Sequence, residues 1–104
     1  MAFSKLKHKF GAKPSILDDI KFASKKERKR YQELKVLQQH GELLFFLRQV
    51  PFHLPGGVKY LCDFMNFWQN GSVTIEDVKG MKTPMYILKK KQVEKLYPIT
   101  ITEI

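Results

Sequence analysis

The chain has 104 residues and a formal net charge of +9, and 43% of its residues are hydrophobic. This length favours one domain, and the apolar content is enough for a core, which excludes a wholly disordered chain. No apolar run approaches the ~20 residues that span a bilayer, and the N-terminus lacks a signal-peptide core, so we expect no membrane partner. A single cysteine, Cys62, excludes an internal disulfide and a cysteine-built zinc site, and fits a cytoplasmic protein. Small size without such staples leaves little stability margin and favours a homodimer.

The positive charge is concentrated near the N-terminus. Residues 1–30 contain ten Lys/Arg and three acids, whereas residues 31–104 contain nine and seven. A basic arm joined to a nearly balanced body is typical of a protein that binds a polyanion. DNA is the first candidate, while an anionic membrane, an acidic protein or a merely solubilising surface are the alternatives.

Residues 1–14 are basic and contain Gly11 and Pro14, which predicts a flexible arm before a domain at 15–104. Residues 15–23 predict a small hairpin around Asp18-Asp19. Ser24 begins a capping pattern with Glu27, and Gly41 stands where a helix C-cap belongs, which predicts a helix at 25–40.

Three strands and a second helix are expected to follow. Residues 43–54 and 58–68 are rich in β-formers, and Asn70-Gly71 predicts a hairpin into a third strand at 72–79. Thr83 and Pro84 predict the start of a helix that runs to about Tyr97, before a last strand at 99–103. The expected fold is a single α+β domain in the broad α/β class, with a central mixed sheet of about four strands, the order αβββαβ, and flanking helices.

Acidic residues within apolar strands are the main anomaly. Asp63 lies inside the apolar segment 58–68, and Glu76, Asp77 and Lys79 close the third strand. A buried carboxylate is unfavourable unless it is paired or holds a metal. An ion pair between Asp77 and Lys79 at a strand end is the simpler explanation for either residue alone.

The combined pattern resembles the active-site motif of the PD-(D/E)XK nuclease superfamily, and is similar to its small phage endonucleases. It consists of Tyr60-x-x-Asp63-Phe64, a tight hairpin, and Ile75-Glu76-Asp77-Val78-Lys79-Gly80, with Cys62 where a proline often precedes the Asp. Ser24-x-x-Glu27 and Gln49 match further features of phage-type and transposase-associated members. The resemblance covers roughly residues 15–104. It implies an endonuclease of phage or prophage origin, acting on branched or duplex DNA in a bacterial cytoplasm.

The residue types fit this chemistry independently. Phosphodiester hydrolysis uses a metal that polarises the phosphate and activates water, and carboxylates suit Mg²⁺, with Mn²⁺ as a substitute. We expect Asp63 and Asp77 to hold the metal, with the Val78 carbonyl as a further oxygen ligand. Lys79, two residues from Asp77 and on the same strand face, could orient the water or stabilise the phosphate. We therefore expect Asp63, Asp77, Lys79 and Glu27 to form the catalytic set.

Glu27 has two candidate roles. It can complete the capping box, or it can bind the metal, because Glu27, Tyr31, Leu34 and Gln38 share the inward stripe of the helix. Cys62 is expected to be a core residue whose apolar neighbours raise its pKa.

The hairpin register decides whether a site can form. A two-residue turn at Asn70-Gly71 would place Asp63 and Asp77 on opposite faces, whereas a three-residue loop, 69–71, places them opposite each other. Gly71 favours the three-residue loop, because the last residue of such a loop adopts a left-handed conformation, which glycine adopts without a steric penalty.

The nucleic-acid-binding residues are expected on the arm, the first helix and two later positions. They are Lys5, Lys7, Lys9, Lys13, Lys25, Lys26, Arg28, Lys29, Arg30, Gln49 and Lys82. The alternative to a nuclease is a non-catalytic phage module on the same fold that binds nucleic acid or a host protein. A complete set of Asp63, Asp77 and Lys79 favours the enzyme, since a pure binder has no need for acids near phosphate.

Overall fold

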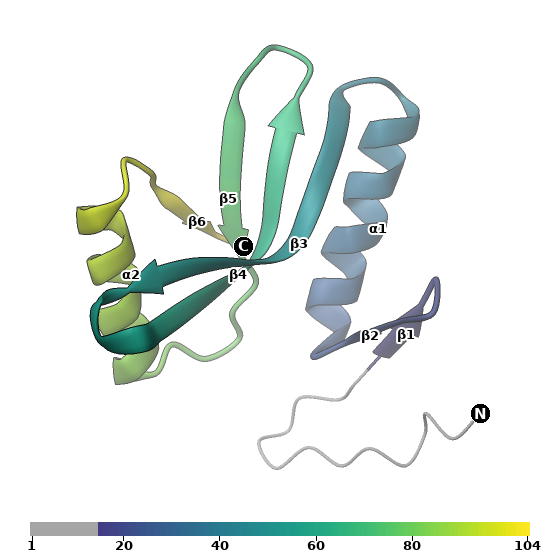
Figure 1. Cartoon of the computed structure of the whole chain (residues 1–104). Helices are drawn as coiled ribbons and strands as arrows, with labels where there is room; N and C mark the ends of the chain where they lie inside the picture. Colours follow the sequence, from purple (N-terminus) through teal and green to yellow (C-terminus); the bar gives the residue numbers. More distant parts are fainter. Residues whose placement is uncertain (1–14) are drawn as a thin grey trace.

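The computed structural model describes residues 15–104, which form an α+β domain with a mixed four-stranded sheet and two helices (Figure 1). The predicted arm, with Lys5, Lys7, Lys9 and Lys13, lies outside the described residues. The elements are β1 (Ser15–Leu17), β2 (Ile20–Phe22), α1 (Lys25–Gln39), β3 (Leu43–Leu54), a 3₁₀ turn (Pro55–Gly57), β4 (Val58–Trp68), β5 (Val73–Asp77), α2 (Pro84–Leu96) and β6 (Ile101–Glu103).

The small hairpin, both helices and the first two long strands confirm the sequence predictions. The turn of the β1–β2 hairpin has Asp18 and Asp19 at φ 53° and 61°, a left-handed conformation that Asp tolerates better than most residues. The Ser24 hydroxyl accepts a hydrogen bond from Glu27 N–H at the start of α1, and Thr83 does the same for α2. Gly41, at φ 80°, follows the C-cap of α1.

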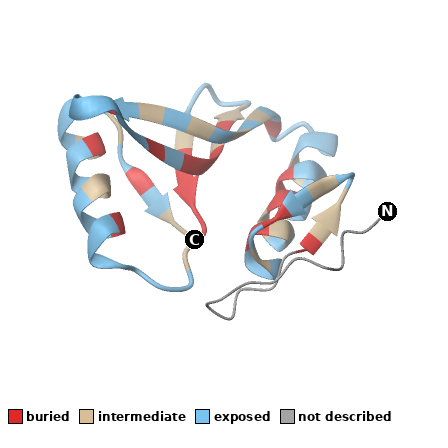
Figure 2. Cartoon of the chain, turned by 60° about the horizontal axis from the view of Figure 1, so that its bottom comes forward, coloured by how far each residue is buried: buried red, intermediate tan, exposed pale blue. Residues whose placement is uncertain are grey.

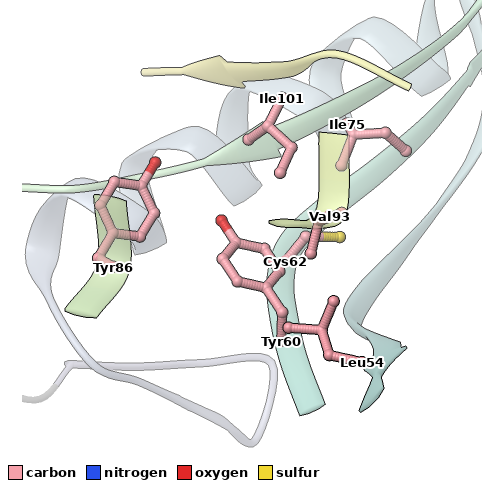
Figure 3. Packing of buried hydrophobic residues seen from close by; sticks show 7 residues of the cluster. All are labelled: Leu54, Tyr60, Cys62, Ile75, Tyr86, Val93 and Ile101. Carbon is pink, nitrogen blue, oxygen red and sulfur yellow. The ribbon is translucent and has the colours of Figure 1, made fainter. Parts of the chain in front are cut away.

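The sheet order is β3-β4-β5-β6, with β3, β4 and β5 antiparallel and β6 parallel to β5. Figure 2 shows the sheet between the two helices. One core cluster joins α1 to the sheet through Tyr31, Leu34 and Phe64. The other joins α2 to it through Val93, Cys62 and Ile75 (Figure 3). Neither helix of residues 15–104 is long and apolar enough to cross a membrane.

The loop between β4 and β5 has three residues, as predicted. Trp68 N–H donates to the Ser72 carbonyl at 2.9 Å, and Gly71 adopts φ 90°. Phe64 pairs with Glu76, and the same register places Asp63 opposite Asp77. The two acids therefore occupy facing positions on neighbouring strands.

The third strand is shorter than the predicted 72–79, because it ends at Asp77. Val78 N–H donates to Asp63 Oδ2 at 2.8 Å instead of to a neighbouring strand. Because the Val78 N–H donates to the Asp63 carboxylate, it cannot form the backbone hydrogen bond that would extend the sheet, and β5 ends at Asp77. The last strand begins at Ile101 rather than at 99, because Ile101 N–H donates to the Glu94 carboxylate.

The β3–β4 hairpin bends near its middle (Figure 1), where its pairing is interrupted. Arg48 pairs with Phe64 and Val50 with Cys62, but Gln49 and Asp63 between them form no ladder pair. Phe64 packs in the α1 cluster, whereas Cys62 packs in the α2 cluster. Residues two apart share a face in a regular strand, so β4 turns over between these positions. Asp63 lies at the crossover, where its carboxylate accepts hydrogen bonds from Gln49 of β3 and from Val78 after β5.

Candidate active site

The centre of the site is the pair of facing acids at the end of β5. Asp63 is 8% exposed and Asp77 is fully buried. Asp63 N–H donates to Asp77 Oδ1 at 3.1 Å, and the Asp63 carboxylate accepts the Val78 N–H described above. The backbone of each strand thus fixes the acid of the other, which holds both carboxylates in defined positions.

The Asp77 carboxylate is incompletely satisfied. Within residues 15–104, Oδ2 is buried and has no hydrogen-bond partner. Burial raises the pKa of Asp77 from 3.8 to about 6, and the charge of Lys79 is the main influence in the opposite direction. A buried carboxylate oxygen without a hydrogen-bond partner is unfavourable, and a bound cation would supply the missing partner.

Gln49 connects Asp63 to the first helix. Its Nε2 donates to Asp63 Oδ1 at 3.2 Å and to Glu27 Oε2 at 3.3 Å. The backbone of Gln49 is left-handed, with φ 52°, in the middle of a strand. Such a conformation costs a non-glycine residue about 1–3 kcal/mol and is often found at functional sites. The strained position places the amide between two carboxylates.

This strain gives a stability prediction. Gln49→Gly should be more stable than Gln49→Ala by about 1 kcal/mol, because both lose the amide but only glycine adopts a positive φ freely. In an ordinary strand position alanine is the more stable of the two. Urea unfolding of both variants measures the difference. Alanine as the more stable variant would contradict the strained conformation.

Glu27 does not complete the predicted capping box, since among residues 15–104 its carboxylate accepts no hydrogen bond from Ser24 N–H, and its metal-binding role stays a prediction. Ser24 caps its backbone N–H, but its 4%-exposed side chain turns to β3, where Arg48 Nη2 lies 3.2 Å from Oε2. Burial and the charge of Asp63 raise the pKa of Glu27, and Arg48 partly offsets them. A pocket of about 360 Å³ opens beside it, lined by residues that include Lys21, Arg48 and Gln49. The predicted inward stripe is correct through Leu34, but Gln38 is exposed.

The predicted position of Lys79 needs a correction. Because β5 ends at Asp77, Lys79 is not on a strand face, and it forms no ion pair with Asp77 among the described residues. Its Nζ lies 5.0 Å from the ring centroid of Tyr86. It still acts on Asp77 through its charge. The simpler explanation, a strand-end ion pair, is therefore wrong as well.

The three predicted metal ligands do not form one cluster. In residues 15–104 no three His, Cys, Asp or Glu side chains are grouped as a metal site. Glu27 contacts Gln49 and Arg48, whereas Asp77 contacts the backbone of Asp63. Mg²⁺ commonly takes only one or two protein carboxylates, and fills its other positions with water and phosphate. Asp63 and Asp77, with the free Oδ2, fit such a site.

The predicted nucleic-acid-binding residues separate into two groups. Lys25, Lys26 and Lys29 are exposed on α1, and Arg28 is half-buried. Arg30 instead forms a bidentate pair with buried Glu76, at 2.8 and 2.6 Å, and therefore has a structural partner. Lys82 Nζ lies 3.0 Å from Glu103 Oε1. Gln49 belongs to the carboxylate site, by which we mean Glu27, Gln49, Asp63 and Asp77. Arg30 is thus held by Glu76 within the domain, and its contact with DNA stays a prediction.

Arg48 was not predicted as a site residue from the sequence, whereas the position of Cys62 in the core is confirmed. The Cζ atom of Arg48 lies 4.6 Å from the ring centroid of Phe22, and its Nη2 donates to Glu27. The one feature of the sequence that could have indicated this role is a charged residue inside an apolar strand. Cys62 is fully buried, and burial raises the pKa of its thiol to about 11, which favours the protonated thiol of a core residue.

The comparisons with known proteins give a family but no activity. The model of one family, described as a protein of unknown function (DUF1064), matches residues 7–102. No curated protein matches the chain. Because the match spans most of the sequence, including every residue of the carboxylate site, the chain belongs to the DUF1064 family.

Proposed function

We propose that this protein is a metal-dependent endonuclease that hydrolyses DNA phosphodiester bonds. The observation that carries the proposal is the buried, facing pair of Asp63 and Asp77, with an unpaired Asp77 oxygen. The resemblance to PD-(D/E)XK nucleases, on Asp63, Asp77 and Lys79, supports it. So does the net charge of +9, which attracts a polyanion.

Each residue has a role that follows from its position. Asp63 and Asp77 would hold Mg²⁺ or Mn²⁺, which when bound supplies Lewis-acid polarisation of the phosphate. Lys79 stabilises negative charge on the phosphate from the side of α2. Gln49 holds Asp63 and Glu27 in place, and Glu27 extends the group of buried acids toward α1. The exposed lysines of α1 add sequence-independent affinity for the DNA backbone.

The test uses the full chain with plasmid, a four-way junction, a flap and single strands, each in Mg²⁺, Mn²⁺ and EDTA. We expect metal-dependent cleavage of at least one substrate, and none by an Asp63→Asn/Asp77→Asn double variant. Calorimetry with Mn²⁺ alone provides a readout independent of activity. Absence of both cleavage and Mn²⁺ binding would favour the non-catalytic binding module.

The basic N-terminal segment gives a separate prediction. Deletion of residues 1–13 should flatten the dependence of log affinity on log salt, by about 0.9 for each duplex phosphate that the segment neutralises. Mn²⁺ affinity should not change, because the carboxylates lie in the retained domain. Fluorescence anisotropy across a salt series measures the slope. An unchanged slope would show that this segment does not contact DNA.

A further inference from the structure

A second pocket lies beside Lys79, between the start of β4 and the first turns of α2. It has a volume of about 350 Å³. Its lining includes Lys59, Lys79 and Lys89, together with Tyr60, Leu61 and Met85. This volume lies within the range of small-ligand sites. The pocket shares Lys79 with the proposed active site, so a ligand in it would adjoin the reacting phosphate.

The three lysines of this pocket have no carboxylate partner within ion-pair distance in the described part of the chain. Lys59, Lys79 and Lys89 form no ion pair there, whereas Lys82 and Lys90 both pair with Glu103, at 3.0 and 3.7 Å. Three ammonium groups around one cavity repel each other, and a bound anion relieves that repulsion. The pocket therefore favours a phosphate group.

The remaining lining combines two exposed apolar side chains with hydroxyl groups, one of which has no partner. Leu61 and Met85 are 51% and 59% exposed, which leaves a hydrophobic surface beside the lysines. Tyr60 is only 5% exposed, and among residues 15–104 its hydroxyl has no hydrogen-bond partner. The neighbouring Tyr86 hydroxyl donates to Glu103 at 2.8 Å. The ring centroids of these two tyrosines lie 6.3 Å apart. Both are labelled in Figure 3.

We propose that this pocket binds an unpaired nucleotide next to the phosphodiester at the Asp63–Asp77 site. Lys59 and Lys89 take its phosphate, Lys79 lies toward the reacting phosphate, and the face of its base covers Leu61 and Met85. Contact through the face of a base tolerates any sequence, because every base has one. The inference rests on the proposed nuclease function for the position of the neighbouring phosphate, but binding itself needs no metal and no turnover.

The first experiment measures anisotropy of a labelled oligothymidylate with the full chain in EDTA. Lys59→Ala/Lys89→Ala should lower the affinity about tenfold and reduce the salt slope by about 0.7, the value of the one single-strand phosphate that the two lysines share. Lys91→Ala/Lys95→Ala removes the same charge from exposed positions of α2 and should change the affinity less than about twofold. Equal losses in the two variants would overturn the proposal.

The second experiment tests the apolar surface. Met85→Glu should weaken oligothymidylate binding, whereas Leu96→Glu, at a similarly exposed position near the end of α2, should not. Two results would overturn the nucleotide assignment. One is unchanged oligothymidylate binding by Met85→Glu. The other is a Met85→Glu variant that loses binding to phosphatidylserine vesicles but still binds oligothymidylate. If wild type cleaves DNA but the pocket variants bind normally, the pocket fails and the nuclease stands. If the variants lose binding but wild type cleaves nothing, the pocket stands and the nuclease fails.

Discussion

Asp77→Asn should reduce cleavage by at least ~10³-fold and at the same time stabilise the fold at neutral pH. Asparagine keeps the acceptor for Asp63 N–H, so the facing arrangement of β4 and β5 persists. It removes the charge that the proposed metal requires, and it also removes a buried, partly unsatisfied carboxylate. Opposite effects on activity and stability are typical of a residue kept for function.

The stabilisation should depend on pH with a defined sign. The pKa of Asp77 is about 6 in the folded chain and 3.8 ordinarily, so the folded state holds this proton more tightly. The resulting stability is fully present below pH 3.8 and is lost as the pH rises through about 6. The loss amounts to about 3 kcal/mol for a pKa rise of that size. The advantage of Asp77→Asn should therefore grow over this range and level off above it.

Urea unfolding of wild type and Asp77→Asn across the pH range measures this difference directly. Glu76→Gln is the matched control, since it is the neighbouring buried acid and pairs with Arg30 instead. It should destabilise the fold, because it weakens a buried ion pair, and leave Mn²⁺ affinity intact. A stability advantage of Asp77→Asn that does not vary with pH would contradict the raised pKa.

The facing acids could be predicted from the sequence because local rules determine them. Gly71 allows the three-residue loop, and the loop alone sets the register that places Asp63 opposite Asp77. The ends of α1 could be predicted as well, because Ser24 caps its start and Gly41 follows its C-cap. These features depend on a few consecutive residues.

The features that the sequence did not predict depend on contacts between distant segments. The end of β5 at Asp77 requires the carboxylate of Asp63, and the side chain of Glu27 is directed by Arg48, 21 residues away. The left-handed Gln49 has no local signal, because glutamine has no preference for positive φ. The sequence therefore did not predict that Glu27 contacts Arg48 and Gln49, whereas Asp77 contacts the backbone of Asp63.

Lys79→Ala should lower the rate of cleavage by at least ~10²-fold while leaving DNA affinity nearly unchanged. Lys79 is one of nineteen cationic residues, so its loss has little effect on total attraction to DNA. It lies next to Asp77, however, where its charge acts on both the carboxylate and the proposed reacting phosphate. The effect should therefore appear in kcat and hardly in the dissociation constant.

A shift in the pH profile distinguishes this role from a structural one. Since Lys79 lowers the pKa of Asp77, its removal should raise that pKa and move the acid limb of the rate profile to higher pH. Lys95→Ala is the matched control, because Lys95 is exposed on α2 and forms no ion pair among the described residues, and it should change neither the rate nor the limb. A wild-type rate in Lys79→Ala would reject its catalytic role. A lower rate with an unmoved acid limb would mean that Lys79 acts on the phosphate alone, and that the charge of Asp77 is set by burial.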